Sequence, residues 1–139
     1  MDLSRALDFA GDRSRGVLMT LRSNGRPQAS NIAYALDDGL ARISVTDDRA
    51  KTANLRRDPR ASLHVTSDDF WQYVVLEADA ELTPVAQAPG DATCLELRDY
   101  YRAVSGEHDD WDEYDAAMVR DRRLVVRLRP THAYGMVRD

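Results

Sequence analysis

A short basic segment in the first half of the chain carries the residue types best suited to hold a phosphate group. Residues 48–60 read DRAKTANLRRDPR and contain five basic and two acidic residues, within a chain whose net charge is −5. Lys51 is the only lysine of the protein, which otherwise uses arginine for its positive charges. Arginine offers a planar fork and lysine a compact point charge. Arg49 and Lys51 at the start of a short helix would therefore suit a single phosphate; the alternative is a solvated helix with ordinary surface charge.

The sequence shows no other motif for catalysis, nucleotide binding or metal binding. The sequence has no Ser/His/Asp signature and no glycine pattern for binding a nucleotide. Its three histidines, His64, His108 and His132, lie far apart and not at metal-ligand spacing. His64 is expected to pack within a strand or at an interface, and His132 to be solvated or to line a pocket. An enzyme without these groups often takes its chemistry from a cofactor, which fits a phosphate site near Lys51.

Composition limits the class of protein further. The chain has 139 residues, 43% hydrophobic and 31% charged, which predicts one globular domain spanning residues 1–139. An acidic chain argues against nucleic acid as the main partner. Cys94 is the only cysteine, which excludes an internal disulfide; it is expected to be a small buried hydrophobe. Neither a signal peptide nor an apolar run of membrane-spanning length is apparent, so we expect a cytoplasmic protein without membrane partners.

The elements that must position the basic segment begin with closely spaced strands. Residues 2–11 predict an amphipathic helix that buries Leu3, Leu7 and Ala10. Strands are expected over 16–21, from Pro27 to about 36, and over 40–46. The turns between them lie at 23–26, where Asn-Gly favours a hairpin, and at 37–39. Three antiparallel strands joined in this way form a meander.

A helix is expected to begin near Arg49, capped by Asp47 or Asp48, and to end at Asp58-Pro59. Its core face would contain Leu55 and either Ala50 or Ala53. The pattern beyond it predicts a strand over 60–66, a strand pair or one bent strand over 71–82, a loop over 84–90, helices over 92–104 and 111–121, and strands over 123–128 and 133–137 separated by Pro130. The inward residues of the two helices would be Leu97, Tyr101 and Val104 in the first and Tyr114, Ala117 and Met118 in the second. The fold class is thus mainly β with flanking helices, as an antiparallel barrel or sandwich.

Aromatic residues gather directly after the acidic turn that follows the 60–66 strand. Phe70, Trp71 and Tyr73 lie within four positions of one another. Aromatic side chains at the edge of a turn either pack into the core or stack on a planar ring or a partner subunit. The sequence leaves both interpretations open.

Several segments together resemble a known family. They are GVLMTL at 16–21, NGRPQASN at 24–31, RAKTANLRRDPRAS at 49–62, YYR at 100–102, GEH at 106–108, DW at 110–111, MVRDRR at 118–123 and HAYG at 132–135. They resemble the pyridoxamine 5'-phosphate oxidase-like split β-barrels, and within these the actinobacterial flavin/deazaflavin oxidoreductases that use coenzyme F-420. The resemblance covers nearly the whole chain. Its most specific part is the combination of the segment around Lys51 with the GEH and DW segments.

The resemblance implies a homodimer of split β-barrels with two cofactor sites between the subunits. It places the cofactor phosphate on Arg49 and Lys51, with Ala50 contributing backbone, and gives Ser44 a contact to the phosphate or ring. The other residues that it implicates are Gln28 and Asn31 near the deazaflavin ring, Trp71 where the partner subunit closes the site, and Asn54, Arg56 and Arg60 as weaker candidates for the acidic tail of the cofactor.

The activity that the resemblance implies is hydride transfer from reduced F-420 to an unsaturated organic acceptor. A polyanionic cofactor needs a local basic groove in an acidic protein, and the protein would mainly position the acceptor. No residue stands out as a general acid; water or Tyr134 could deliver a proton. Two alternatives stay open: an FMN-binding oxidase or reductase of the wider family, and a protein that binds F-420 without catalysis.

Overall fold

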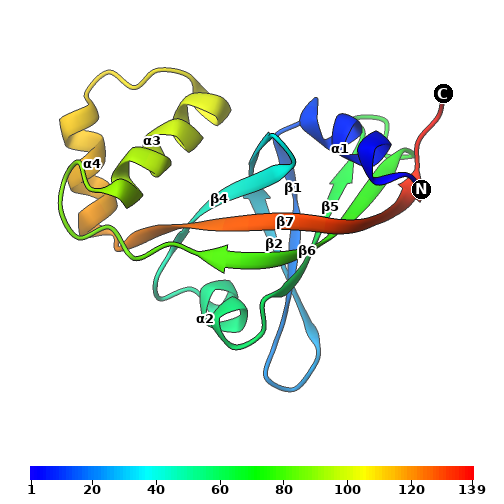
Figure 1. The fold of residues 1–139 in the computed structure, drawn as a ribbon, viewed down its shortest axis with the longest axis horizontal. Helices are drawn as coiled ribbons and strands as arrows, with labels where there is room; N and C mark the ends of the chain where they lie inside the picture. Colours follow the sequence, from blue (N-terminus) through cyan, green and yellow to red (C-terminus); the bar gives the residue numbers. More distant parts are fainter.

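The computed structural model describes residues 1–139 as one curled, antiparallel seven-stranded sheet with four helices around it (Figure 1). The strand order is β2-β1-β5-β6-β7-β4-β3. The strands are β1 (Arg15–Leu21), β2 (Pro27–Ala33), β3 (Ala35–Asp37), β4 (Leu40–Thr46), β5 (Arg60–Thr66), β6 (Tyr73–Leu82) and β7 (Arg123–Met136), and the helices are α1 (Leu3–Gly11), α2 (Ala50–Arg57), α3 (Ala92–Ser105) and α4 (Trp111–Arg120). This is the split-barrel fold that the sequence led us to expect.

The predicted meander is only partly correct, because its middle strand is divided at Tyr34. The first half, β2, pairs with β1, and the second half, β3, pairs with β4. These halves form the two opposite edges of the sheet. The Tyr34 side chain between them is 1% exposed and its hydroxyl donates to the carbonyl of Ala10, 2.6 Å away. The bend at Tyr34 therefore brings the two edges of the sheet toward each other.

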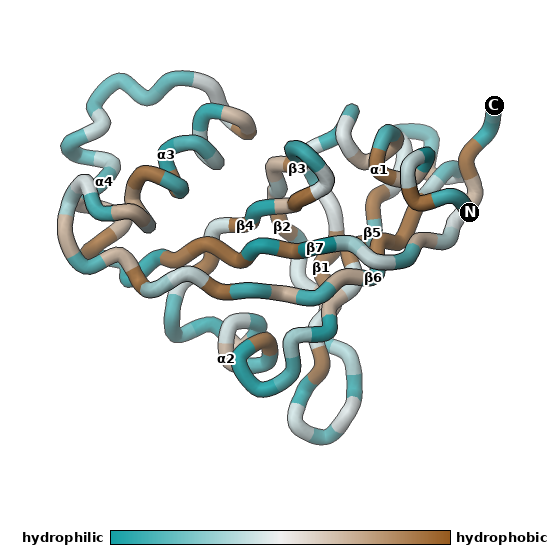
Figure 2. Tube along the Cα trace, in the orientation of Figure 1, coloured by the Kyte–Doolittle hydropathy of each residue, from teal (hydrophilic) through white to brown (hydrophobic).

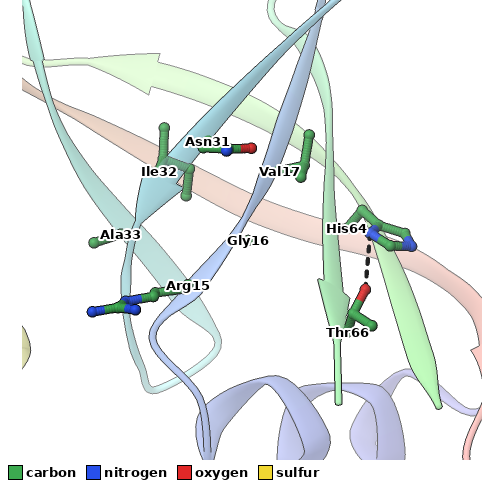
Figure 3. A pocket seen from close by; sticks show the side chains of 8 residues that line it. All are labelled: Arg15, Gly16, Val17, Asn31, Ile32, Ala33, His64 and Thr66. Carbon is green, nitrogen blue, oxygen red and sulfur yellow. Dashed lines mark hydrogen bonds between the residues drawn. The ribbon is translucent and has the colours of Figure 1, made fainter. Parts of the chain in front are cut away.

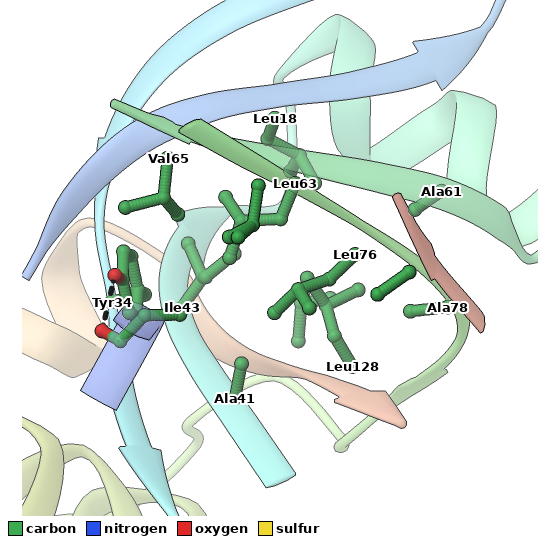
Figure 4. Close-up of a cluster of buried hydrophobic side chains, with 14 of the residues drawn as sticks. Leu18, Tyr34, Ala41, Ile43, Ala61, Leu63, Val65, Leu76, Ala78 and Leu128 are labelled. Carbon is green, nitrogen blue, oxygen red and sulfur yellow. Dashed lines mark hydrogen bonds between the residues drawn. The ribbon is translucent and has the colours of Figure 1, made fainter. Parts of the chain in front are cut away.

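The inside of the curled sheet holds the main hydrophobic core (Figure 4). Alternate residues of each strand face inward, as expected from the period of two along a strand. In β5 these are Ala61, Leu63 and Val65, and the neighbouring strands contribute Leu18 and Leu76. Burying each of the larger aliphatic side chains stabilises the fold by about 1.5–3 kcal/mol relative to leaving it exposed. Helix α1 closes one end of this core with Ala6, Phe9 and Ala10, whereas the predicted Leu3 and Leu7 are only partly buried.

Replacing Tyr34 with phenylalanine is expected to destabilise the protein by about 1 kcal/mol, since it removes a buried hydrogen bond and leaves the Ala10 carbonyl without that donor. Denaturant unfolding of the variant measures the change. Tyr73→Phe, at a half-buried tyrosine with no hydroxyl hydrogen bond in the structure, serves as the control. Equal stability of the Tyr34 variant and wild type would contradict a role for this hydroxyl in tying the strand bend to α1.

The last strand is longer than the sequence predicted. Pro130 was expected to separate two strands, but β7 runs without interruption and pairs with both β6 and β4. Opposite Ala78 and Glu77 the register of β6 shifts, so that Ala78 pairs with Pro130 and Glu77 with His132. Thr131 is the extra residue of this bulge. A β-bulge tolerates the missing N–H of proline, which explains why Pro130 does not end the strand.

Helices α3 and α4 form a hairpin that packs on the outer face of β4 and β7, around a second, smaller core (Figure 1). This core contains Cys94, Leu97, Tyr114 and Val125, which confirms that Cys94 is a buried hydrophobe. The segment that leads from α3 to α4 is hydrophilic (Figure 2). Of the other residues predicted to face inward, Tyr101 and Met118 pack at the margin of this core. None of the four helices has the combination of length and apolar composition needed to cross a membrane.

Helix α2 differs from its prediction in its cap and in its buried face. The cap position is Arg49, which makes no capping hydrogen bond with its side chain, and neither Asp47 nor Asp48 serves as the cap. Asp47 instead pairs with two arginines. Leu55 is buried as expected, but Thr52 and Asn54 are buried beside it, and Ala50 and Ala53 are exposed. Most of α2 is hydrophilic (Figure 2), so the sheet holds it through polar contacts as well as through Leu55.

Candidate functional site

The first turn of α2 lies beside the end of β4 and the start of β7. Basic side chains of α2 and β7 meet there. The registers pair Ser44 with Val125 and Thr46 with Arg123, so Ser44 and Arg123 are diagonal neighbours on one face of the sheet. The Arg123 guanidinium donates a long hydrogen bond to the Ser44 hydroxyl, with Nη1 and Oγ 3.4 Å apart. Thr52 anchors the helix here by donating to the Thr46 carbonyl at 2.7 Å. Ser44, predicted from the sequence, is thereby placed near the start of α2.

Arg123 is the residue of this site that sequence reasoning missed. Its Nε is buried and has no hydrogen-bond partner in the structure. It also forms no ion pair with any carboxylate, although ten other arginines do. A buried N–H without an acceptor is costly, and an anion is the acceptor that a guanidinium binds most strongly. The sequence shows Arg123 only as one of several arginines near position 120, and the pairing of β4 with β7 is what brings it to Ser44.

Lys51 lies in the same cluster of positive charge. Burial lowers the pKa of its ammonium group, and the nearby charges of Arg49 and Arg123 lower it further. Neither Lys51 nor Arg49 forms an ion pair with a carboxylate of the chain. We define the inner basic site as Ser44, Lys51 and Arg123, with Arg49 at its rim. Ala50, an exposed residue, begins α2 beside it.

Tyr100 of α3 borders the inner basic site. Burial raises the pKa of its hydroxyl, while the charge of Arg123 acts in the opposite direction. The hydroxyl donates to the carbonyl of Ala33 at the end of β2, 2.9 Å away. Tyr100 therefore links the α3–α4 hairpin to the edge strand β2 and marks the side of the site that faces this edge.

Gln28 and Asn54 lie together on the other side of α2, and they are bound to each other. The Asn54 side-chain amide donates to Oε1 of the Gln28 side chain at 3.3 Å and to the Thr20 hydroxyl at 3.1 Å, and its own Oδ1 accepts from Arg57 at 2.9 Å. Asn54 is 6% exposed. These contacts hold α2 against β1 and β2, so both donor and acceptor of Asn54 are already used within the chain.

The structure does not bring Asn31 to the same face as Gln28. The two residues are three positions apart on β2 and consequently point to opposite faces of the strand. Asn31 instead lines a hollow of about 460 Å³ on the outer face of β1, β2 and β5 (Figure 3). His64 and Thr66 line its far side and share a contact of 3.3 Å between Nδ1 and Oγ1. The ring of Tyr73 lies against that of His64, tilted by 31°, with ring centres 5.4 Å apart.

Trp71 does not reach the inner basic site of its own chain. It lies on the turn between β5 and β6, where the ion pair of Asp69 with Arg138 at 3.3 Å holds the turn beside the C-terminus. Phe70 and Trp71 are 65% and 67% exposed and pack edge to face with ring centres 5.0 Å apart. Packing into the core is therefore excluded for both Phe70 and Trp71.

The two remaining arginines predicted for an acidic tail are paired within the chain. Arg56 contacts Asp47 at 2.6 Å, and Arg60 contacts Asp58 at 2.8 Å. The Arg60 side chain lowers the pKa of Asp58 to about 2, mainly through its hydrogen bond. Neither arginine belongs to the cluster around Lys51, so the structure separates them from the residues that carry uncompensated charge.

The inner basic site fits the phosphate of a cofactor. It presents three groups near the start of α2: the Arg123 guanidinium with its buried, unpartnered Nε, the half-buried Lys51 ammonium group and the Ser44 hydroxyl. A phosphate supplies acceptors for Arg123 Nε, for the Lys51 ammonium group and for the Ser44 hydroxyl. The fold defines a split-barrel protein, and this site holds the hydrogen-bond donors that a phosphate group needs.

The chain belongs to the pyridoxamine 5'-phosphate oxidase family, which it matches over residues 5–136. Among solved structures, it is similar to an F420 reductase with 24% identity and a TM-score of 0.65, over 91% of this chain and 94% of that one. A heme-binding protein from Mycobacterium smegmatis is 26% identical with a TM-score of 0.69, over 94% of this chain and 52% of that one. An FAD-binding protein from Mesorhizobium loti is 16% identical with a TM-score of 0.69, over 97% and 92%. The family assignment supports a flavin-type oxidoreductase.

Proposed function

We propose that the protein is an oxidoreductase that depends on coenzyme F-420 and reduces an unsaturated organic acceptor. The observation that carries this proposal is the inner basic site, where Lys51 and Arg123 have no acid partner and Arg123 Nε is buried without an acceptor. The F420 reductase that shares the fold supports the choice of cofactor, as does the resemblance of the GEH and DW segments.

When bound, reduced F-420 supplies a hydride. The residues of the chain would bind and orient it: Lys51 and Arg123 neutralise its phosphate, and Ser44 donates a hydroxyl hydrogen bond to it. Tyr100, whose hydroxyl donates to the carbonyl of Ala33, would border the bound phosphate on the side toward β2. Positioning of this kind is the main contribution that a protein makes to hydride transfer by a cofactor.

FMN binding is the second candidate, because the inner basic site would accept one phosphate from either cofactor. An FMN-dependent oxidase or reductase would use Lys51 and Arg123 in the same way. The FAD-binding protein of the same fold supports a flavin as the ligand. F-420 and FMN differ in the groups attached to the phosphate, and the inner basic site does not contact those groups.

We also propose that the protein acts as a homodimer in which Trp71 closes the site of the partner subunit. Large apolar side chains lie exposed at the end of the sheet that is formed by the β5–β6 turn and the end of β7; they are Phe70, Trp71, Tyr134 and Met136, each between 47% and 67% exposed. Exposed apolar groups of this size mark interaction sites. Light scattering of the purified protein measures the mass, and a monomer at all concentrations would rule out this assembly.

The experiment that tests the function is a fluorescence titration of the purified apoprotein with F-420 and, in parallel, with FMN. Tight F-420 binding with weak FMN binding is the expected result. A preference for FMN would move the protein to the second candidate. F-420 binding without turnover of any acceptor in a broad panel would identify a binding protein without catalysis, and the absence of binding to either ligand would refute both candidates.

A further inference from the structure

The hollow on the outer face of β1, β2 and β5 is separate from the inner basic site, and we call it the outer-face hollow. Its volume of about 460 Å³ is within the range of pockets that hold small organic molecules. Three of its eight lining residues are hydrophobic, and its polar side chains are those of Arg15, Asn31, His64 and Thr66 (Figure 3). The lining therefore combines an apolar surface with hydrogen-bonding groups and contains no carboxylate.

Arg15 gives the outer-face hollow a permanent positive charge that no acid of the chain neutralises. Its exposed side chain forms neither an ion pair nor a hydrogen bond. Asp12 and Asp68 line a neighbouring hollow together with Arg15, but neither pairs with it. The side chain lies on the β2 side of the outer-face hollow, across from Thr66 (Figure 3). The planar fork of this guanidinium is therefore available to a carboxylate, whose geometry it matches.

The charge on this face of the sheet changes sign farther along the strands. A second hollow of about 480 Å³ lies there, lined by Met19, which is two positions from Val17 on β1 and so points to the same face. Its lining includes the carboxylates of Glu77 and Asp79, and its arginine, Arg60, already has an acid partner. An anionic ligand is thus attracted to the outer-face hollow and repelled by its neighbour.

A single side chain separates the outer-face hollow from the inner basic site. The Tyr100 hydroxyl donates at 2.9 Å to the carbonyl of Ala33, a residue that lines the hollow. Burial raises the pKa of this hydroxyl, while the backbone N–H of Ser44 and the charge of Arg123 act against the rise. Tyr100 therefore has the hollow on one side and two residues of the inner basic site on the other. A cofactor with its phosphate in the inner basic site would lie beside a molecule bound in the hollow.

We propose that the outer-face hollow binds the acceptor, and that the acceptor is an unsaturated organic acid whose carboxylate is held by Arg15. Asn31 and Thr66 supply further hydrogen-bond donors, and Val17 with the other apolar residues contacts the hydrocarbon body. The proposal rests on the proposed function and adds a substrate class to it. In the reaction, the hydride of the reduced cofactor adds to one carbon of the acceptor's double bond and a proton from water adds to the other. The acceptor gains two electrons, and the cofactor is left oxidised.

Binding of matched acids and amides to the protein loaded with oxidised F-420 tests this proposal. The acids are sorbic, cinnamic and 3-(2-naphthyl)acrylic acid, which differ in the size of the hydrocarbon body, and the primary amide of each keeps its shape without the charge. Calorimetric titration compares wild type with Arg15→Gln and Arg15→Lys. The control is Arg22→Gln, which removes one charge from an exposed arginine of the β1–β2 turn that forms no ion pair. Thermal unfolding checks that all variants are folded.

Wild type is expected to bind at least one of the acids about three- to fivefold more tightly than its amide, on the scale of an ion pair made by an exposed arginine. Arg15→Gln should lose this preference while its affinity for the amide stays unchanged, and Arg15→Lys and the control should keep it. The preference should also shrink as ionic strength rises. Saturating acid should leave the affinity for F-420 unchanged, because acceptor and cofactor occupy different sites.

The outcomes separate this proposal from the proposed function. Equal affinity for every acid and its amide would overturn the acidic acceptor and leave the F-420 assignment intact. A preference for the acid that survives in Arg15→Gln would overturn the role of Arg15. Competition between the acid and F-420 would overturn the assignment of the hollow to the acceptor, since the cofactor would then occupy it. A protein that binds no F-420 at all would refute the proposed function, and the role of the acid as an acceptor with it.

Discussion

Replacing Lys51 with alanine is expected to weaken cofactor binding by about 1–3 kcal/mol, or about 5- to 150-fold in Kd. The ammonium group is half-buried beside Arg49 and Arg123, and burial together with these charges lowers its pKa. Keeping this ammonium group charged in its surroundings therefore costs free energy, and a bound phosphate would offset that cost. Fluorescence titration with F-420 measures the loss. Unchanged affinity would remove Lys51 from the phosphate site.

Two further measurements separate charge from a general structural effect at this position. Lys51→Arg keeps the charge and should retain most of the affinity lost in Lys51→Ala. Because an anion favours the protonated ammonium, wild-type affinity should fall as pH rises through the lowered pKa of Lys51, below its ordinary value of 10.5. Lys51→Arg should not show this fall, since arginine stays protonated. A fall of the same size in both proteins would assign the pH dependence to another group.

Replacing Asp115 with alanine is expected to destabilise the protein by about 3–5 kcal/mol, the usual cost of breaking a buried ion pair from one side. The Asp115 side chain is 2% exposed and binds Arg98 through two hydrogen bonds of 2.9 and 2.8 Å. It also accepts from the backbone N–H of Gly90 at 2.8 Å. Its loss would leave the Arg98 guanidinium and this N–H unpaired between α3, α4 and the loop before α3. Denaturant unfolding measures the change.

The pH dependence of stability provides an independent check on Asp115. The hydrogen bonds of Arg98 hold the pKa of this carboxyl below its ordinary value, against the opposing effect of burial. A carboxyl with a lowered folded-state pKa stabilises the protein above its unfolded pKa of about 3.9, and this contribution is lost as pH falls through the folded-state value. Asp115→Asn should lose this part of the acid sensitivity. The exposed pair of Arg120 with Asp121 offers a control, since Asp121→Asn should change stability by less than about 1 kcal/mol.

The α3–α4 hairpin connects the stability of the protein to its candidate site. Asp115 and Arg98 hold the two helices together. The same hairpin contributes Tyr100 to the border of the inner basic site. A variant that loosens the hairpin is therefore expected to weaken cofactor binding as well, without touching a residue that contacts the phosphate.

The sequence by itself determined the class of fold and indicated where to look for a candidate site. Alternating apolar residues predicted most strands and their antiparallel order, because burial on one face of a sheet requires this period. The single lysine in an arginine-rich chain indicated the start of α2, and Arg49 lies there in the structure, at the cap position of the helix. These are local signals, which depend on residues close together in the chain.

Tertiary structure decided which distant residues meet at that site. Arg123 reaches Ser44 because β7 pairs with β4, a contact between residues 79 positions apart. The resemblance placed both Gln28 and Asn31 near the ring, although the period of two along the strand predicted from Pro27 already sends them to opposite faces. Pro130 suggested a break in the last strand. The bulge opposite Glu77 and Ala78, which accommodates the proline, depends on the register of a partner strand and is not visible in the sequence. Long-range pairing and the burial of Arg123 Nε are properties of the folded chain, and no local pattern of residues specifies them.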